Sequence, residues 1–222
     1  MKLMKRIILG LLAFIVAYFV IGMILSDYVF PPEKPDLTNY FSPGDRLISH
    51  SEGFHQTVLS TADGWVHLRL EAQPMAPGPP VHLHEQFEEK FYVKTGALSI
   101  QVGEEKKILG PGESITIPKL TPHRPFNETT GTVVVVSDED TKTVPIEFAY
   151  FLSQIYPLVD KFGGRPSPLQ VMMQFSVYGS EADAYIADGP PVGLQKIMRT
   201  LLRPTARLLG YKYYYPEYIP QH

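Results

Sequence analysis

The chain has 222 residues, of which 20 are lysine or arginine and 23 are aspartate or glutamate, so its formal net charge is −3. A hydrophobic content of 44% with 19% charged residues is typical of a protein with a folded core and excludes a disordered chain. The absence of cysteine excludes disulfide bonds, a thiolate metal ligand and a cysteine nucleophile.

The chain begins with a basic tip and a long apolar segment. Lys2, Lys5 and Arg6 precede 19 uncharged residues, Ile7 to Leu25, which as a helix would extend about 28 Å. This length matches the hydrocarbon thickness of a bilayer, and the basic residues predict a cytoplasmic N-terminus. A cleaved signal peptide is the alternative, but it normally has a shorter apolar region, about 7–15 residues, and a small-x-small site. No such site follows the segment here, so an uncleaved single-pass anchor is expected, with the rest of the chain extracytoplasmic.

Short strand-like segments follow a proline-rich linker. Between Gly64 and Gln73, Val66, Leu68 and Leu70 alternate with polar residues, which indicates a strand with one buried face. Similar short segments occur in the ranges 46–60, 97–102, 106–109, 113–117 and 132–137. Short, regularly spaced strands without helices between them predict a mainly β fold, an antiparallel jelly-roll barrel.

Three residues in the middle of this region have the spacing of metal ligands. His82 and His84 are two residues apart, so in a strand they point to the same face. Glu89 shares the parity of Phe91 and Val93, which places its carboxylate on an inner face. Two imidazoles and a carboxylate suit Fe(II), Mn(II), Zn(II), Ni(II) or Cu(II). A fourth candidate ligand, His123, follows in the sequence Thr-Pro-His-Arg-Pro.

These stretches resemble the two sequence motifs of the cupin superfamily. The first motif has four matching positions, His82, His84, Glu89 and Gly96, and the second has four more, Gly112, Pro118, His123 and Asn127. The resemblance covers about residues 41–140 and implies a cupin barrel. One position departs from the family, which usually has glycine where this chain has Leu120. Glycine permits a positive φ there, which leucine adopts only at a cost, so the turn carrying His123 is expected to differ from that of the family.

Neighbouring polar residues are weaker candidates. Glu88 has the opposite strand parity to Glu89 and is expected to be solvated. His67 and Arg69 share one face of the strand before the motif. If that face looks inward, Arg69 would hold an anionic substrate; the alternation favours an outward, solvated face.

After residue 143 the apolar period lengthens to that of a helix. Helices are expected over 145–162 and 168–178, and an amphipathic helix is expected within 190–210. The last contains a basic stripe, with residues at spacings of three, four and four: Lys196, Arg199, Arg203 and Arg207. Tyrosines follow it. Two arrangements of residues 190–218 are equally compatible with this pattern: contact with an anionic bilayer, or a helix packed on its own domain with a solvated basic face.

The expected organisation has six parts: a cytoplasmic basic tip (1–6), a transmembrane anchor (7–26), a linker (27–40), a cupin barrel (41–141), a helical extension (142–186) and a basic amphipathic tail (187–222). Residues 31–186 contain 12 basic and 20 acidic residues, a net charge of −8. This acidic body would repel phosphates, so no nucleic-acid partner is expected.

Three kinds of function are compatible with these features. In cupin-like oxygenases three histidines and a glutamate hold a divalent metal and leave positions for substrate and O2. The resemblance implies this role for His82, His84, His123 and Glu89, with Glu89 also acting as a catalytic base. An isomerase or lyase that polarises a carbonyl needs the same residues. The second kind is a non-catalytic module that binds or senses a small molecule, and the third is an accessory subunit of a membrane complex, with a homodimer also open.

Overall fold

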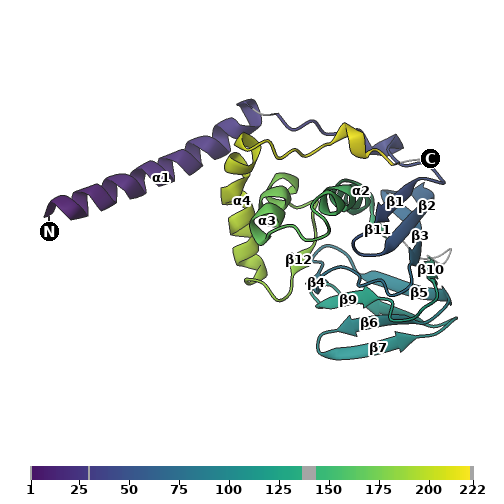
Figure 1. Ribbon diagram of the computed structural model, residues 1–222. Helices are drawn as coiled ribbons and strands as arrows, with labels where there is room; N and C mark the ends of the chain where they lie inside the picture. Colours follow the sequence, from purple (N-terminus) through teal and green to yellow (C-terminus); the bar gives the residue numbers. More distant parts are fainter. Residues whose placement is uncertain (1, 30, 137–143, 221–222) are drawn as a thin grey trace. The chain divides into compact units, whose positions relative to one another are not determined.

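The computed structural model describes residues 2–29, 31–136 and 144–220, and its elements are labelled in Figure 1. Contacts along the chain divide it into two compact units. The first, the helical unit, contains Met1–Lys34, Ser167–Gly179 and Gly193–Tyr214. The second, the β unit, contains Pro35–Pro166, Ser180–Val192 and Tyr215–His222. The expected boundary between residues 141 and 142 lies outside the described residues.

Two antiparallel sheets form the β unit. The larger has the order β1 (Arg46–Ser49), β2 (Phe54–Ala62), β3 (Trp65–Ala72), β10 (Val133–Val136), β5 (Glu89–Thr95) and β8 (Ser114–Ile117), with β11 (Val144–Pro145) paired to β3. The smaller has the order β12 (Tyr185–Ile186), β4 (His82–Leu83), β9 (His123–Phe126), β6 (Leu98–Val102) and β7 (Glu105–Leu109). Short 3₁₀ helices lie at Leu37–Asn39 and Pro216–Tyr218. The expectation of antiparallel β structure with added helices is confirmed.

The two sheets share one hydrophobic core. Val93 and Val133 of the larger sheet and Leu98 and Ile100 of the smaller sheet are completely buried in the same cluster. Val93 and Val133 alternate along their strands with more exposed residues, which is the pattern of sheets that pack face to face. This core holds together the strands that carry the candidate ligands.

Helix α2 (Ile146–Lys161) packs against the larger sheet and matches the helix expected over 145–162. Near its C-terminal end the Asp160 carboxylate accepts hydrogen bonds from the main-chain N–H groups of His50 and Ser51, both at 2.8 Å. The adjacent Glu52 is affected by this arrangement. Burial and then the negative charge of Asp160 raise the pKa of Glu52 from its ordinary value of 4.5 to about 7.

We expect the contribution of Glu52 to the stability of the β unit to fall as pH rises. A carboxyl group whose pKa is raised by folding binds its proton more tightly in the folded state, so its contribution is greatest at low pH and falls between pH 4.5 and about 7. Glu52→Gln should therefore unfold with up to about 3 kcal/mol more free energy than the native chain at pH 8, and with a much smaller difference at pH 5. Denaturant unfolding at both pH values checks this, with Glu104→Gln, at an exposed hairpin position, as the control. Equal pH dependence in the native chain and Glu52→Gln would contradict it.

The helical unit contains three long helices. These are α1 (Lys2–Val29), α3 (Pro168–Tyr178) and α4 (Val192–Leu208), whose first residue belongs to the β unit. Ser167 accepts a hydrogen bond from the Gln170 N–H and Gln170 caps it in return, so α3 begins with a capping box. Lys2–Ser26 has the length and composition to cross a membrane and is not buried, although a signal sequence would meet the same test. Helix α4 runs through Pro204 and ends before Gly210, which has a φ of 86°.

One expectation for the tail is wrong. In one of the two expected arrangements, a tail helix packed on its own domain turns its basic face to solvent. Lys196 is exposed, but Arg199 and Arg207 are buried. The Arg199 guanidinium lies 4.8 Å above the ring of Phe175 in α3. The amphipathic pattern defines the two faces of a helix, but it does not determine which face packs inward.

Candidate metal centre

The structure brings together the four residues that the motifs singled out. His82 opens β4 and His84 directly follows it, Glu89 opens β5, and His123 opens β9. Strands β4 and β9 are neighbours, and His82 and His123 are directly paired. One ligand atom from each residue lies within 4.8 Å of every other. We call these four residues the His/Glu cluster; it is able to hold a metal ion.

Main-chain carbonyls orient two of the imidazoles. The Nδ1 atom of His82 lies 2.9 Å from the carbonyl oxygen of Pro80, and that of His123 lies 2.9 Å from the carbonyl oxygen of Thr121. A carbonyl oxygen only accepts hydrogen bonds, so in each neutral ring Nδ1 carries the proton and Nε2 presents its lone pair. This is the usual second-sphere arrangement of a metal-binding histidine.

The third imidazole is oriented in the same way from further along the chain. His84 Nδ1 donates to the main-chain carbonyl of Asp183. His84 Nε2 is buried and makes no hydrogen bond within the described residues; the Glu89 carboxylate is 3.5 Å away. A buried nitrogen without a hydrogen bond is unfavourable unless another partner binds it. The donor set therefore fits a divalent cation at the point where the Nε2 atoms converge.

The charges within the cluster also suit a cation. Burial raises the pKa of Glu89, but the proximity of its carboxylate to His123 Nε2, at 2.8 Å, and to His84 Nε2, at 3.5 Å, outweighs burial and lowers it. Burial and then repulsion from the other two imidazoles lower the pKa of His82 to about 3. Burial opposes a charged His123, but its contact with Glu89 raises the His123 pKa. At neutral pH the cluster thus contains an ionised carboxylate and a neutral His82.

The His/Glu cluster has one more open side. The side chains of His84 and His123 are 2% and 1% exposed, whereas that of Glu89 retains 18% exposure. His82 is also only partly buried, so a small molecule would approach from the side of Glu89 and His82.

Asp183 supports the ligand segment and was not identified from the sequence. Its carboxylate accepts hydrogen bonds from the main-chain N–H groups of Glu85, at 3.0 Å, and Gln86, at 2.7 Å. Strand β12 follows at once and pairs with β4, which places Ile186 opposite His82. A segment near the end of the expected helical extension thus covers the edge of the strand that carries the two histidines.

Replacing Asp183 with alanine is expected to weaken metal binding about tenfold, because the segment that carries His84 loses two hydrogen-bond acceptors. Asp188→Ala is the matched control, since Asp188 is an exposed residue of the turn that follows β12. Calorimetric titration of both variants with Mn(II) measures the effect. Equal affinities for the two variants would show that Asp183 does not position His84.

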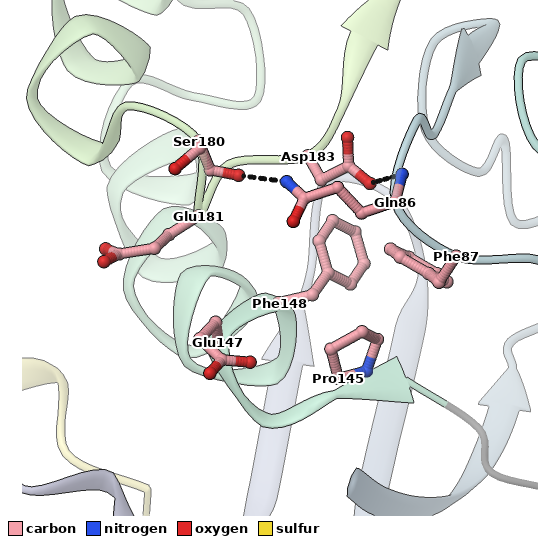
Figure 2. A pocket seen from close by; sticks show the side chains of 8 residues that line it. All are labelled: Gln86, Phe87, Pro145, Glu147, Phe148, Ser180, Glu181 and Asp183. Carbon is pink, nitrogen blue, oxygen red and sulfur yellow. Dashed lines mark hydrogen bonds between the residues drawn. The ribbon is translucent and has the colours of Figure 1, made fainter. Parts of the chain in front are cut away.

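Two phenylalanines form a wall beside His84. Its imidazole stacks on the Phe87 ring at 4.4 Å between centroids and meets the Phe148 ring edge-on at 4.9 Å. Both rings line a cavity of about 260 Å³, shown in Figure 2. The other lining residues are mostly polar: Gln86, Pro145, Glu147, Ser180, Glu181 and Asp183. No member of the His/Glu cluster lines this cavity, so it lies behind the phenylalanine wall.

Tyr156 of α2 also went unnoticed in the sequence. Its hydroxyl accepts a hydrogen bond from Gln56 Nε2 at 2.8 Å. Burial, followed by the negative charges of Glu52 and Glu89, raises the pKa of its phenol. The hydroxyl therefore keeps its proton and can donate a hydrogen bond. The position of Tyr156 among the buried residues of α2 is the only feature that could have identified this residue from the sequence.

The other candidate residues lie outside the cluster. Arg69 is exposed and pairs with Glu71 at 2.8 Å, while Val66 and Leu68 on the opposite face are buried. The prediction of a solvated Arg69 is confirmed, and the substrate-holding alternative is wrong for this arrangement. Glu88 is exposed, as expected.

Leu120 adopts the conformation of the glycine it replaces. Its φ is 61°, and its N–H donates to the carbonyl of His84 at 2.7 Å. The expectation of an altered turn is therefore wrong: leucine adopts the positive φ here, despite its cost for a residue with a Cβ atom. The hydrogen bond ties the second motif directly to the first.

Comparison with known proteins gives one family match. A family model described as "Cupin domain" matches residues 68–137. No curated protein matches the chain. Among solved structures, KdgF from Halomonas sp. is 23% identical, with 40% of this chain and 83% of that chain covered and a TM-score of 0.34. A sugar phosphate isomerase of the cupin superfamily from Silicibacter pomeroyi is 20% identical, with 47% and 76% covered and a TM-score of 0.36. A cupin-2 domain containing protein from Shewanella frigidimarina is also 20% identical, with 38% and 79% covered and a TM-score of 0.32.

Proposed function

Because residues 68–137 place this chain in the cupin superfamily, we propose that it is a membrane-anchored metalloenzyme of the oxygenase type that acts on a small organic molecule. The His/Glu cluster would hold the metal, and the two sheets would be the halves of a jelly-roll barrel around it. Residues 7–26 would span the membrane, with residues 1–6 in the cytoplasm and the cupin domain outside it.

One observation carries this proposal. Three histidines, each with Nδ1 bonded to a main-chain carbonyl, turn Nε2 toward one carboxylate, and all four ligand atoms lie within 4.8 Å of one another. A set of three nitrogens and one oxygen suits Fe(II) or Mn(II), and also Ni(II), Zn(II) or Cu(II). A bound Fe(II) would supply Lewis acidity and open positions for the substrate and O2.

The protein groups have separate tasks in such a reaction. Glu89 is ionised and lies on the more open side, so it would accept a proton from the substrate. The Tyr156 hydroxyl would donate a hydrogen bond within the barrel. Phe87 and Phe148 pack on His84 and would exclude water from that side of the metal.

A non-catalytic binding or sensing module is the second candidate. The cavity of about 260 Å³ lies beside the His/Glu cluster rather than over it. A ligand held there would touch Asp183 and the phenylalanine wall without reaching the metal. In that case the metal would be structural.

Elemental analysis of the purified full-length chain tests the metal site. We expect nearly one metal per chain in the native protein and in His67→Ala, and less than about a tenth of that in His84→Ala, which lacks a ligand. His67 is a strand histidine outside the cluster, so it is a matched control. The absence of metal from the native protein, even after reconstitution, would overturn the proposal.

Oxygen consumption then separates the two candidates. The Fe(II)-loaded native protein, mixed with a panel of small phenolic and carbonyl compounds, should consume O2 with at least one of them, and the loaded Glu89→Gln variant should not. A protein that keeps its metal, binds one of these compounds and consumes no O2 with it would favour the binding module.

A further inference from the structure

Helix α4 turns its apolar face outward. Leu194, Ile197, Leu201 and Leu208 are 46%, 57%, 38% and 57% exposed. Their spacings of three, four and seven residues place them on one stripe along the helix. We call these four residues the α4 stripe. On the other side Gln195, Arg199 and Arg207 are buried. A helix in contact with water normally has the reverse arrangement, so this surface is suited to an apolar environment.

This stripe belongs to a helix that packs against α1. A Cβ atom on Gly22 would lie only 3.0 Å from the Cβ of Pro204, so the two backbones approach closely because residue 22 is glycine. The Tyr18 hydroxyl lies 3.4 Å from the Thr205 hydroxyl, and Ser26 of α1 is buried. Both helices are in the helical unit, and Figure 1 shows the C-terminal part of α4 meeting the C-terminal part of α1, with the rest of α4 extending away from α1 rather than along it.

In the proposed span, the contact between Gly22 and Pro204 would lie at the depth in the bilayer that is typical of interfacial helices. Gly22 is four residues, or about 6 Å, from the end of the proposed span at residue 26. Helices that lie in a membrane interface bury their apolar faces about 5–10 Å into the boundary between headgroups and acyl chains. A helix that crosses α1 at Gly22 would therefore lie at this boundary, parallel to the bilayer.

We propose that α4 lies in the plane of the bilayer, at the outer end of α1, with the α4 stripe among the lipid acyl chains. This inference rests on the proposed membrane span of residues 7–26. It differs from the contact expected from the basic stripe, because the buried Arg199 and Arg207 do not face the headgroups. The attachment is apolar, so its partner is the lipid bilayer itself rather than an anionic headgroup.

Spin labelling of the full-length protein in phosphatidylcholine vesicles tests this arrangement. The chain has no cysteine, so each of Ile197→Cys, Leu201→Cys and Leu208→Cys gives a single labelled site. Lys196→Cys, at an exposed polar position of α4, is the matched control. Ile15→Cys reports on the middle of the proposed span. For each label, collision rates with O2, which concentrates in lipid, and with water-soluble chromium oxalate are compared.

We expect the ratio of O2 to chromium oxalate collisions to be roughly tenfold higher at the three positions of the α4 stripe than at Lys196, and highest at Ile15. A low ratio at the stripe with a high ratio at Ile15 would overturn the α4 proposal alone. A low ratio at Ile15 would overturn the membrane span and, with it, the α4 proposal. Low collision rates with both reagents at the stripe would show that protein covers it, which also contradicts the proposal.

Discussion

Replacing Asn127 with alanine is expected to lower the free energy of unfolding of the β unit by about 3–5 kcal/mol. The Asn127 residue is buried, and its Nδ2 lies 3.1, 2.8 and 2.8 Å from the carbonyl oxygens of Ala72, Gln73 and Gly131. Its Oδ1 accepts from the N–H and the hydroxyl of Thr129, at 2.9 and 2.7 Å. The alanine variant removes all five of these hydrogen bonds.

Denaturant unfolding followed by tryptophan fluorescence measures this loss. Trp65, the single tryptophan of the chain, lies in β3 and therefore reports on the β unit. Asn39→Ala, at an exposed position, should change the unfolding free energy by less than about 0.5 kcal/mol. A loss below about 1 kcal/mol in Asn127→Ala would mean that the turn does not depend on this side chain.

Replacing Glu89 with glutamine is expected to weaken Mn(II) binding about 100-fold or more. Glutamine has nearly the same shape, so the fold should persist, but the cluster loses its single anionic ligand. A neutral amide oxygen binds a divalent cation far more weakly than a carboxylate does. Competition with a chelating dye measures the two dissociation constants.

Glu88→Gln supplies the comparison for this variant. Glu88 is the adjacent residue and allows the same chemical change, but it is exposed and is not a member of the His/Glu cluster. Its affinity for Mn(II) should match that of the native chain. Similar weakening in both variants would mean that the overall charge of the region, rather than ligation by Glu89, determines the affinity.

Much of the His/Glu cluster was predictable because strand parity has a period of two. His82 and His84 share a face for that reason, and Glu89 shares the inner face with Phe91 and Val93. Strand β9 was harder to recognise, since Pro125 lies inside it and proline argues against a strand. The position of His123 was therefore indicated by the motif, and its pairing with His82 by the structure.

The support from Asp183 could not be predicted. Its main-chain carbonyl accepts a hydrogen bond from His84, which is 99 residues away in the sequence. Every residue has a main-chain carbonyl, so the residue type does not indicate this contact. The same limit applies to α4. Its amphipathic pattern is plain in the sequence, but packing against α1 and α3 decides that the arginines are buried and the leucines exposed.

The most direct test of the metal site is anomalous diffraction from crystals of the Mn(II)-loaded protein at a wavelength near the manganese edge. The account predicts one strong peak bounded by the four ligand atoms of the His/Glu cluster, about 2.0–2.3 Å from each. A protein shown to contain manganese, but with its anomalous peak elsewhere, would contradict the assignment of these residues as the metal ligands.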